Sequence, residues 1–178
     1  MGFRIKIENV VASTSLNTKI KLEKLVANLD NVEYEPEQFP GLVFRIKEPK
    51  AAALIFSSGK VVCTGAKSPK TSKEVIAKIV KKMRTIGIKI PKGYKVRLEN
   101  IVASAKLPTE LNLNKIAFTL VNTEYEPEQF PGLVFRMDDP RVTFLLFGSG
   151  KIICTGGRTI ADVKRAVVKL DKVLRKLK

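Results

Sequence analysis

One segment of this chain occurs twice. The residues from Glu33 to Arg45 recur without change from Glu124 to Arg136, so the second copy lies 124 minus 33, or 91, positions after the first. The same offset relates shorter motifs along the chain: Asn9 and Asn100, Val11 and Val102, Phe56 and Phe147, Ser58-Gly59-Lys60 and Ser149-Gly150-Lys151, and Cys63-Thr64-Gly65 and Cys154-Thr155-Gly156. A single offset throughout indicates an internal duplication.

The duplication predicts the domain organisation. Two copies are too few for a solenoid, so we expect a pseudo-twofold pair that shares one sheet or core. The copies are residues 1–90 and 91–178, with the seam between Gly87 and Gly93. A chain of 178 residues with 44% hydrophobic residues is large enough to bury such a core.

Charge and composition narrow the function. Lysine and arginine number 33 against 17 acidic residues, and the net charge of +16 favours a polyanionic partner, nucleic acid before an anionic membrane surface. Histidine is absent, which excludes His-dependent triads and zinc sites with His ligands. Carboxylate pairs such as Asp138 and Asp139, or Glu35 and Glu37, adjoin turns without supporting ligands. We therefore expect no enzyme, no cofactor and no small-molecule substrate.

Two further features bear on the cellular compartment. Cys63 and Cys154 are too few for a disulfide framework, and their equivalent positions indicate packing in a reducing compartment. No apolar run approaches the roughly 18 residues of a membrane span, and the N-terminus lacks the apolar core of a signal peptide. We expect no membrane partner and a cytoplasmic location, associated with the nucleoid if the protein is archaeal, or a nuclear one if it is eukaryotic.

Each copy shows the pattern strand, helix, four short strands, helix. Alternation from Phe3 to Glu8 begins the first strand, and Asn17 or Thr18 is predicted to cap the first helix. Further strands are predicted at 32–36, 42–48, 51–57 and 60–65, separated by turn residues. A longer amphipathic helix ends each copy. The fold class is therefore α+β, with one antiparallel sheet of about ten strands and four helices on one face.

The other face of this sheet is predicted to be apolar as well. In the strand at 51–57, Ala53 and Ile55 alternate with Leu54 and Phe56, so neither face is polar. Four helical segments suffice to cover only one face of ten strands, and an exposed apolar face indicates a partner surface.

Basic residues flank this apolar face. Arg45 and Lys47 alternate on one strand, Lys60 begins another, and Arg136 and Lys151 repeat the arrangement. An apolar strip between basic edges is typical of a groove for a phosphate backbone. Ordinary exposed cations are the alternative for these residues. A module that binds RNA or another protein is the alternative for the whole face, since surface phenylalanines also stack unpaired bases.

These residues resemble the TATA-binding protein family over essentially the whole chain. The resemblance rests on Asn-Val-Val-Ala at 9–12, Phe39 with Phe56, Ser58-Gly59-Lys60, Thr64-Gly65, and their partners in the second half. It implies a pseudo-twofold saddle whose curved antiparallel sheet carries its helices on the convex face. The chain is most similar to archaeal members, although its basicity departs from the acidic balance of some of them.

The resemblance also implies the role of the protein and of individual residues. The family's members are general transcription initiation factors that bind the TATA element in the DNA minor groove and recruit transcription factor B and RNA polymerase. They kink the DNA with apolar wedges, a property known for the family and implied here by the resemblance alone. The implied wedges are Phe39, Phe56, Phe130 and Phe147. The implied base contacts are Asn9, Val11, Leu54, Val62, Thr64, Asn100, Val102, Leu145, Ile153 and Thr155. The implied phosphate and sugar contacts are Arg45, Ser58, Lys60, Arg136, Ser149 and Lys151. Glu126 and Glu128 are the implied contacts to transcription factor B.

Structural alternatives remain for several of these residues. Asn9 and Asn100 could terminate strands, and Phe39 and Phe130 could fold back onto the core beside Pro-Gly turns. The loop glutamates could be solvated. Because a nearly symmetric protein can bind a pseudo-symmetric A·T element in either direction, polarity would depend on differences between the copies. The clearest are 47–50 against 138–141 and 67–70 against 158–161.

Overall fold

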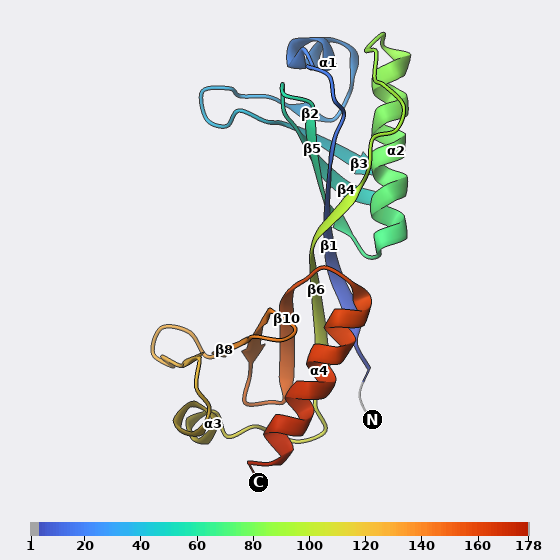
Figure 1. The fold of residues 1–178 in the computed structure, drawn as a ribbon. Coiled ribbons are helices and arrows are strands. Elements are labelled where there is room, and N and C mark those ends of the chain that lie inside the picture. The colour runs from blue at the N-terminus through green and yellow to red at the C-terminus, as the bar shows by residue number, and fades with distance from the viewer. Residues whose placement is uncertain (1–3, 178) are drawn as a thin grey trace. The chain divides into compact units, whose positions relative to one another are not determined.

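A computed structural model describes residues 4–177, which contain ten strands and four helices (Figure 1). The described chain divides into two compact units. The first unit is Asn9–Glu99, and the second unit comprises the other described residues. Strands β1 (Lys6–Ser15) and β6 (Arg97–Lys106) have residues in both. Each unit therefore includes the first residues of a strand that continues into the other.

The first unit has five strands in the order β2-β3-β4-β5-β1, all antiparallel. Its further elements are α1 (Leu22–Asn28), β2 (Val32–Glu33), β3 (Leu42–Lys47), β4 (Lys50–Ile55), β5 (Lys60–Ala66) and α2 (Pro69–Thr85). β6 lies beside β1 in the sheet. Ser13 donates a hydrogen bond to Glu99 at the start of β6, and Thr14 donates one to the carbonyl of Lys95, two residues before β6. Figure 1 shows α2 lying against one face of these strands.

The second unit repeats this topology in the order β6-β10-β9-β8-β7. Its further elements are α3 (Leu113–Thr119), β7 (Thr123–Glu124), β8 (Leu133–Met137), β9 (Val142–Leu146), β10 (Lys151–Gly157) and α4 (Ile160–Arg175). The hydroxyl of Ser104 on β6 donates to Glu8 of β1 at 2.6 Å, which mirrors the contact of Ser13 with Glu99. Over the described residues the fold is thus α+β, with two repeats, a ten-stranded antiparallel sheet and four helices, as predicted.

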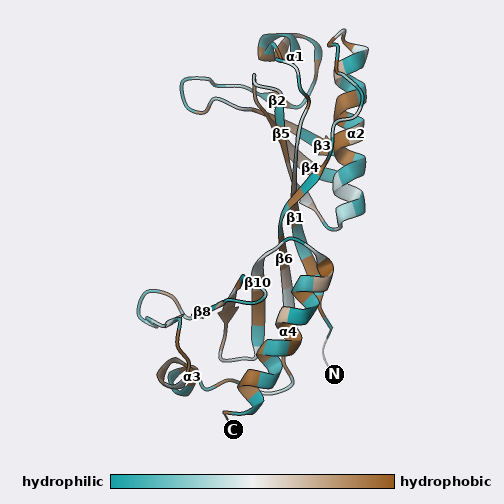
Figure 2. Cartoon of the chain, in the orientation of Figure 1, coloured by the Kyte–Doolittle hydropathy of each residue, from teal (hydrophilic) through white to brown (hydrophobic). Residues whose placement is uncertain are grey.

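The long helices form where the sequence supplies caps and an apolar stripe. Ser68 caps α2 by accepting from the Thr71 N–H at 3.0 Å, and Pro69 occupies the first turn, where its missing N–H costs nothing. The stripe of Val75, Ile79 and Met83 is fully buried. Figure 2 shows hydrophobic and hydrophilic segments alternating along α2, as an amphipathic helix requires. Gly87, with φ of +95°, ends the helix in the left-handed conformation that favours glycine. No helix of the described residues is long and apolar enough to cross a membrane.

The predicted start of the first helix is wrong. Asn17 and Thr18 do not cap it, because α1 begins at Leu22 with Lys21 at the N-cap position. The intervening residues are held in an irregular segment instead: the N–H of Ile20 donates to the carbonyl of Ser57, and Asn17 adopts a left-handed φ of 57°. Hydrogen bonds to the hairpin between β4 and β5 thus override the local capping preference.

Candidate nucleic-acid interface

Each unit has a sheet face that its helices leave uncovered. We call it the open face; in the first unit it consists of Val11, Val43, Ala52, Leu54, Phe56, Val62 and Thr64, and in the second unit of Val102, Val134, Thr143, Leu145, Phe147, Ile153 and Thr155. These side chains are half-buried, whereas their neighbours along the strands, such as Ile55 and Val61, are completely buried under the helices. The apolar second face predicted from the alternation in the sequence is therefore present in both units.

Register brings the open-face residues into cross-strand pairs. Leu54 lies opposite Val62 on β5, and Ala52 lies opposite Thr64. Leu145 lies opposite Ile153 in the same way in the second unit. The ten residues expected to contact bases all belong to the half-buried class and come from β1, β4 and β5 or from their equivalents β6, β9 and β10.

Asn9 is oriented by a β-bulge. The pairing of β1 with β5 shifts between Val10 and Ala12, so Thr64 and Gly65 share the single partner Val11. The N–H of Gly65 donates to Asn9 Oδ1 at 2.7 Å, and Asn9 Nδ2 donates to Thr64 Oγ1 at 3.0 Å. The amide oxygen is thereby engaged, and one N–H of the amide is left to donate to a ligand.

Asn100 repeats this geometry in the second unit. Its Oδ1 accepts from the N–H of Gly156 at 2.6 Å, and its Nδ2 donates to Thr155 Oγ1 at 3.1 Å. The pairing of β10 with β6 shifts at the same place. Each unit therefore presents one oriented amide beside its apolar open face, and both asparagines lie within their strands and do not terminate them.

Two phenylalanine rings meet in each unit. Phe39 and Phe56 pack edge to face with centroids 5.8 Å apart, and Phe130 and Phe147 do so at 5.9 Å. Phe39 and Phe130 remain 41% and 43% exposed, so these rings do not fold back into the core. One ring of each pair comes from the loop before β3 or β8, and the other from the hairpin that follows β4 or β9.

The predicted phosphate-binding residues are exposed at the same strands. Arg45 lies on the same face of β3 as Val43, and its Nη1 is 2.5 Å from Glu33 Oε1. Arg136 makes the same ion pair with Glu124 at 2.7 Å. In the hairpins, Ser58 Oγ accepts from the Lys60 N–H at 3.4 Å and Ser149 Oγ from the Lys151 N–H at 3.3 Å. Ion pairs as exposed as these contribute little, so a phosphate can compete for the arginines.

Sequence reasoning missed two kinds of residue at this interface. Glu33 and Glu124 were not expected to pair with the arginines, although each precedes its arginine by twelve positions in both copies. Gly41 and Gly132 lie directly under the aromatic pairs and were interpreted only as turn residues. In both cases the residues occur at equivalent positions in the two copies, but only the three-dimensional packing shows which residues they contact.

The loop glutamates Glu126 and Glu128 lie between β7 and β8 and are exposed, as are Glu35 and Glu37 in the first copy. The Glu126 carbonyl accepts from the N–H groups of Gln129 and Phe130, and the Glu35 carbonyl accepts from Gln38 and Phe39. These backbone bonds shape identical loops, and the carboxylates are left facing solvent.

Cys63 and Cys154 lie on the opposite, helix-covered side and are free thiols. Burial raises the pKa of Cys63 to about 11 and that of Cys154 to about 12. Both thiols therefore stay protonated at neutral pH and pack as small apolar side chains, as predicted.

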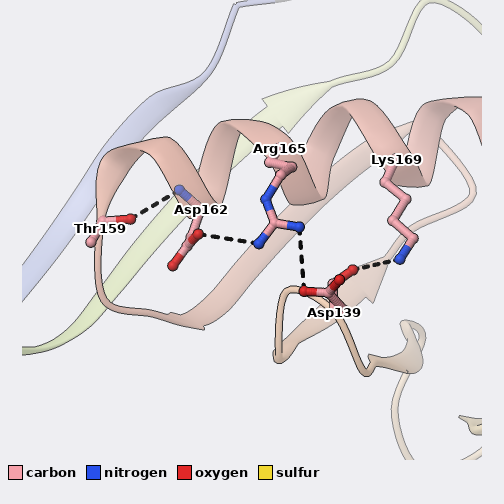
Figure 3. A network of polar contacts seen from close by, with 5 residues as sticks. All are labelled: Asp139, Thr159, Asp162, Arg165 and Lys169. Atoms are coloured by element: carbon pink, nitrogen blue, oxygen red, sulfur yellow. Dashed lines mark hydrogen bonds and ion pairs between the residues drawn. The ribbon is translucent and has the colours of Figure 1, made fainter.

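The helix side differs between the units. In the second unit Arg165 donates to Asp162 and Asp139, with both distances 3.3 Å, and Lys169 donates to the Asp139 carbonyl (Figure 3). The hydrogen bonds to Asp162 and then Asp139 raise the pKa of the Arg165 guanidinium. In the first unit Glu74 occupies the position equivalent to Arg165, and Lys78 donates to the Glu48 carbonyl.

A duplicated α+β unit with an apolar open face, exposed aromatic pairs and basic side chains on that face defines a nucleic-acid-binding repeat protein. Residues 4–86 and 95–177 each match the family model described as transcription factor TFIID, or TATA-binding protein. The chain belongs to the TATA-binding protein family, a family of DNA-binding transcription factors and not of enzymes.

Archaeal proteins are among its relatives. The chain is 55% identical to a TATA-box-binding protein of Methanothermobacter thermautotrophicus, over 97% of this chain and 96% of that protein. It is 54% identical to that of Archaeoglobus fulgidus, over 98% and 97%. The solved structure of the Methanococcus jannaschii TATA-binding protein is 50% identical, has a TM-score of 0.91, and covers 97% of this chain and 99% of that one.

Proposed function

We propose that this protein is a general transcription initiation factor that binds the TATA element in the minor groove of duplex DNA, kinks it with its phenylalanine pairs, and recruits transcription factor B and RNA polymerase. The observation that carries the proposal is the open face. It combines a half-buried apolar surface with an aromatic pair of which one ring is exposed, and it does so in both repeats. The two functional halves are residues 1–90 and 91–178.

The apolar open face suits A·T pairs. The minor-groove edges of A·T and T·A present only acceptors, whereas G·C adds the guanine amino donor. Aliphatic side chains such as Leu54 and Val62 can pack against the edges of A·T pairs, but they offer no hydrogen-bond acceptor to the guanine amino group of a G·C pair. The remaining N–H of Asn9 and that of Asn100 can donate to adenine N3 or thymine O2. The amide orientation required for this is already set by Gly65 and Gly156.

The aromatic pairs act as wedges. An apolar ring inserted between base pairs partly unstacks them and bends the duplex toward the major groove. Flexible pyrimidine–purine steps unstack most readily, so deformability adds to the preference for TATA-like sequence. The exposure of Phe39 and Phe130 supports insertion, because rings that packed in the core would have to be extracted first.

Phosphate binding requires the arginines to change partner. Arg45 and Arg136 would leave Glu33 and Glu124 for the DNA backbone, while Lys60 and Lys151 add charge from the hairpins, beside Ser58 and Ser149. The released glutamates then repel the phosphates, which penalises DNA that the open face does not fit. The exposed carboxylates of Glu126 and Glu128 provide a contact for transcription factor B outside the open face. Acting on the chromosome, the protein would reside in the cytoplasm with the nucleoid.

Competition binding tests this proposal. We expect a duplex with a TATA-like element to bind at least tenfold more tightly than a scrambled duplex or the single strands, with affinity falling steeply as salt rises because counterions are released. Equal affinity for all three DNAs would refute specific recognition. Preference for the single strands or for RNA would favour the alternative stacking module.

A further inference from the structure

Gly41 and Gly132 occupy the same position beneath the two aromatic pairs. Gly41 follows Pro40 in the loop that carries Phe39, and it is buried although the neighbouring loop residues are exposed. The rings of Phe39 and Phe56 close over it from different segments of the chain. Gly132 is covered in the same way by Phe130 and Phe147.

A side chain fits at neither glycine unless the rings move. A Cβ built on Gly41 would lie 2.7 Å from Phe39 Cε2 and 2.9 Å from Phe56 Cε1, and one on Gly132 would lie 2.7 Å from Phe130 Cε2 and 3.0 Å from Phe147 Cε1. Carbon atoms in contact normally lie about 3.5–4.0 Å apart. Both conflicts involve ring edges, so a methyl group must push the two rings away from the backbone and from one another.

The requirement for glycine here is one of space and not of backbone conformation. Gly59 and Gly65 have φ of +95° and +98°, which L-residues rarely adopt, but Gly41 and Gly132 lie outside that region. The absent Cβ is therefore the property that the aromatic pair uses. A Cβ would clash with both rings of the pair in each repeat, so the space left by the glycine is a feature that the two aromatic pairs share.

We propose that Gly41 and Gly132 are positioning residues for DNA bending: each leaves the space in which two phenylalanines join into one wedge. This inference rests on the proposed function. A single unpaired ring would lose side-chain entropy on insertion, whereas a ring packed against its neighbour is already ordered. Substituting either glycine by alanine would separate the rings and weaken the bend at that unit.

The test compares G41A and G132A with G148A in the full chain. Gly148 is a matched control: it adjoins Phe147, a Cβ there meets nothing closer than the Leu111 carbonyl at 3.8 Å, and its counterpart in the first repeat is Ser57. Bending is measured by energy transfer between the ends of a TATA duplex, and ring proximity by the nuclear Overhauser effect between the paired rings. G41A and G132A should lose the ring contact, reduce the bend and weaken binding about tenfold, a loss equivalent to one wedge contact; G148A should match the wild type.

A double variant separates ring positioning from general misfolding. In a Phe39→Ala background only the conflict with Phe56 remains and the two rings are no longer a pair, so adding G41A should cost clearly less bending than it does in the wild type. Wild-type bending by G41A, or a full additional loss in the double variant, would overturn the inference. Failure of the wild type itself to prefer or bend the TATA duplex would instead overturn the proposed function, so the two failures are distinguishable.

Discussion

The two units have nearly the same open face but differently packed cores. On the open face Leu54 and Leu145, Phe56 and Phe147, and Thr64 and Thr155 are identical pairs. On the helix side, Phe44 pairs across the strands with Ala53, both of them buried, whereas the equivalent pair is Phe135 with Phe144. There Phe144 is completely buried and Phe135 is only half-buried.

This difference shows that the open face tolerates fewer sequence changes between the two copies than the core does. Each core accommodates one fully buried aromatic ring between β3 and β4 or between β8 and β9, but the strand that supplies it has changed. A core requires volume and apolar character, and it accepts different arrangements of both. The open face keeps five of its seven residue identities, the exceptions being Ala52 with Thr143 and Val62 with Ile153, which is what a surface that meets a partner of fixed shape demands.

The largest expected effect concerns the buried core phenylalanine, which is Phe44 in the first unit and Phe144 in the second. Phe144→Ala should destabilise the protein by about 3–5 kcal/mol, because it empties a fully buried site, and Phe44→Ala should cost about the same. Phe135→Ala should cost roughly half as much, because that ring is already partly solvated. Urea unfolding of the three variants measures this order. Equal losses at Phe135 and Phe144 would show that burial does not distinguish the two rings.

A smaller effect is expected at the wedges, where the units should behave alike. Phe56→Ala and Phe147→Ala should each reduce DNA bending, measured by end-to-end energy transfer, and weaken binding about tenfold while the fold persists. The reduction should be similar for both because the ring geometries agree within 0.1 Å and a few degrees. An unchanged bend in either variant would remove that ring from the wedge role, and strongly unequal losses would break the equivalence of the units.

The sequence predicted the strands of each copy well, because turn residues at Pro40-Gly41 and Ser58-Gly59 separate runs of clear alternation. The strand predicted at 32–36 is three residues too long, because β2 ends at Glu33, where the loop that carries Phe39 begins. The cap at Asn17 or Thr18 was wrong for a related reason: residues 16–20 bond to the β4–β5 hairpin, a tertiary contact that local propensity does not contain.

The interface could be predicted only in part. Alternation identified the open face, and the repeat offset identified matched residues such as Asn9 and Asn100. The fixed amide orientation, the pairing of Arg45 with Glu33, and the space above Gly41 depend on distances between segments that are remote in sequence. The sequence carried these residues in both copies, but residue identity alone does not specify contact.

The smallest expected effect tests the electrostatic difference on the helix side. Arg165 joins α4 to the turn before β9 through Asp139 and also pairs with Asp162 on its own helix. The first unit has Glu74 and Glu48 at the positions of Arg165 and Asp139. Arg165→Gln should therefore lower the urea midpoint slightly, and Glu74→Gln should leave it unchanged or raise it, because Glu74 forms no such bridge. At about 1 M salt the Debye length falls to ~3 Å, so the effect of Arg165→Gln should shrink as salt rises. A loss that persists undiminished at high salt would assign the stabilisation to packing of the Arg165 side chain, and an equal loss at Glu74 would show that the two helix faces are held alike despite their opposite charges.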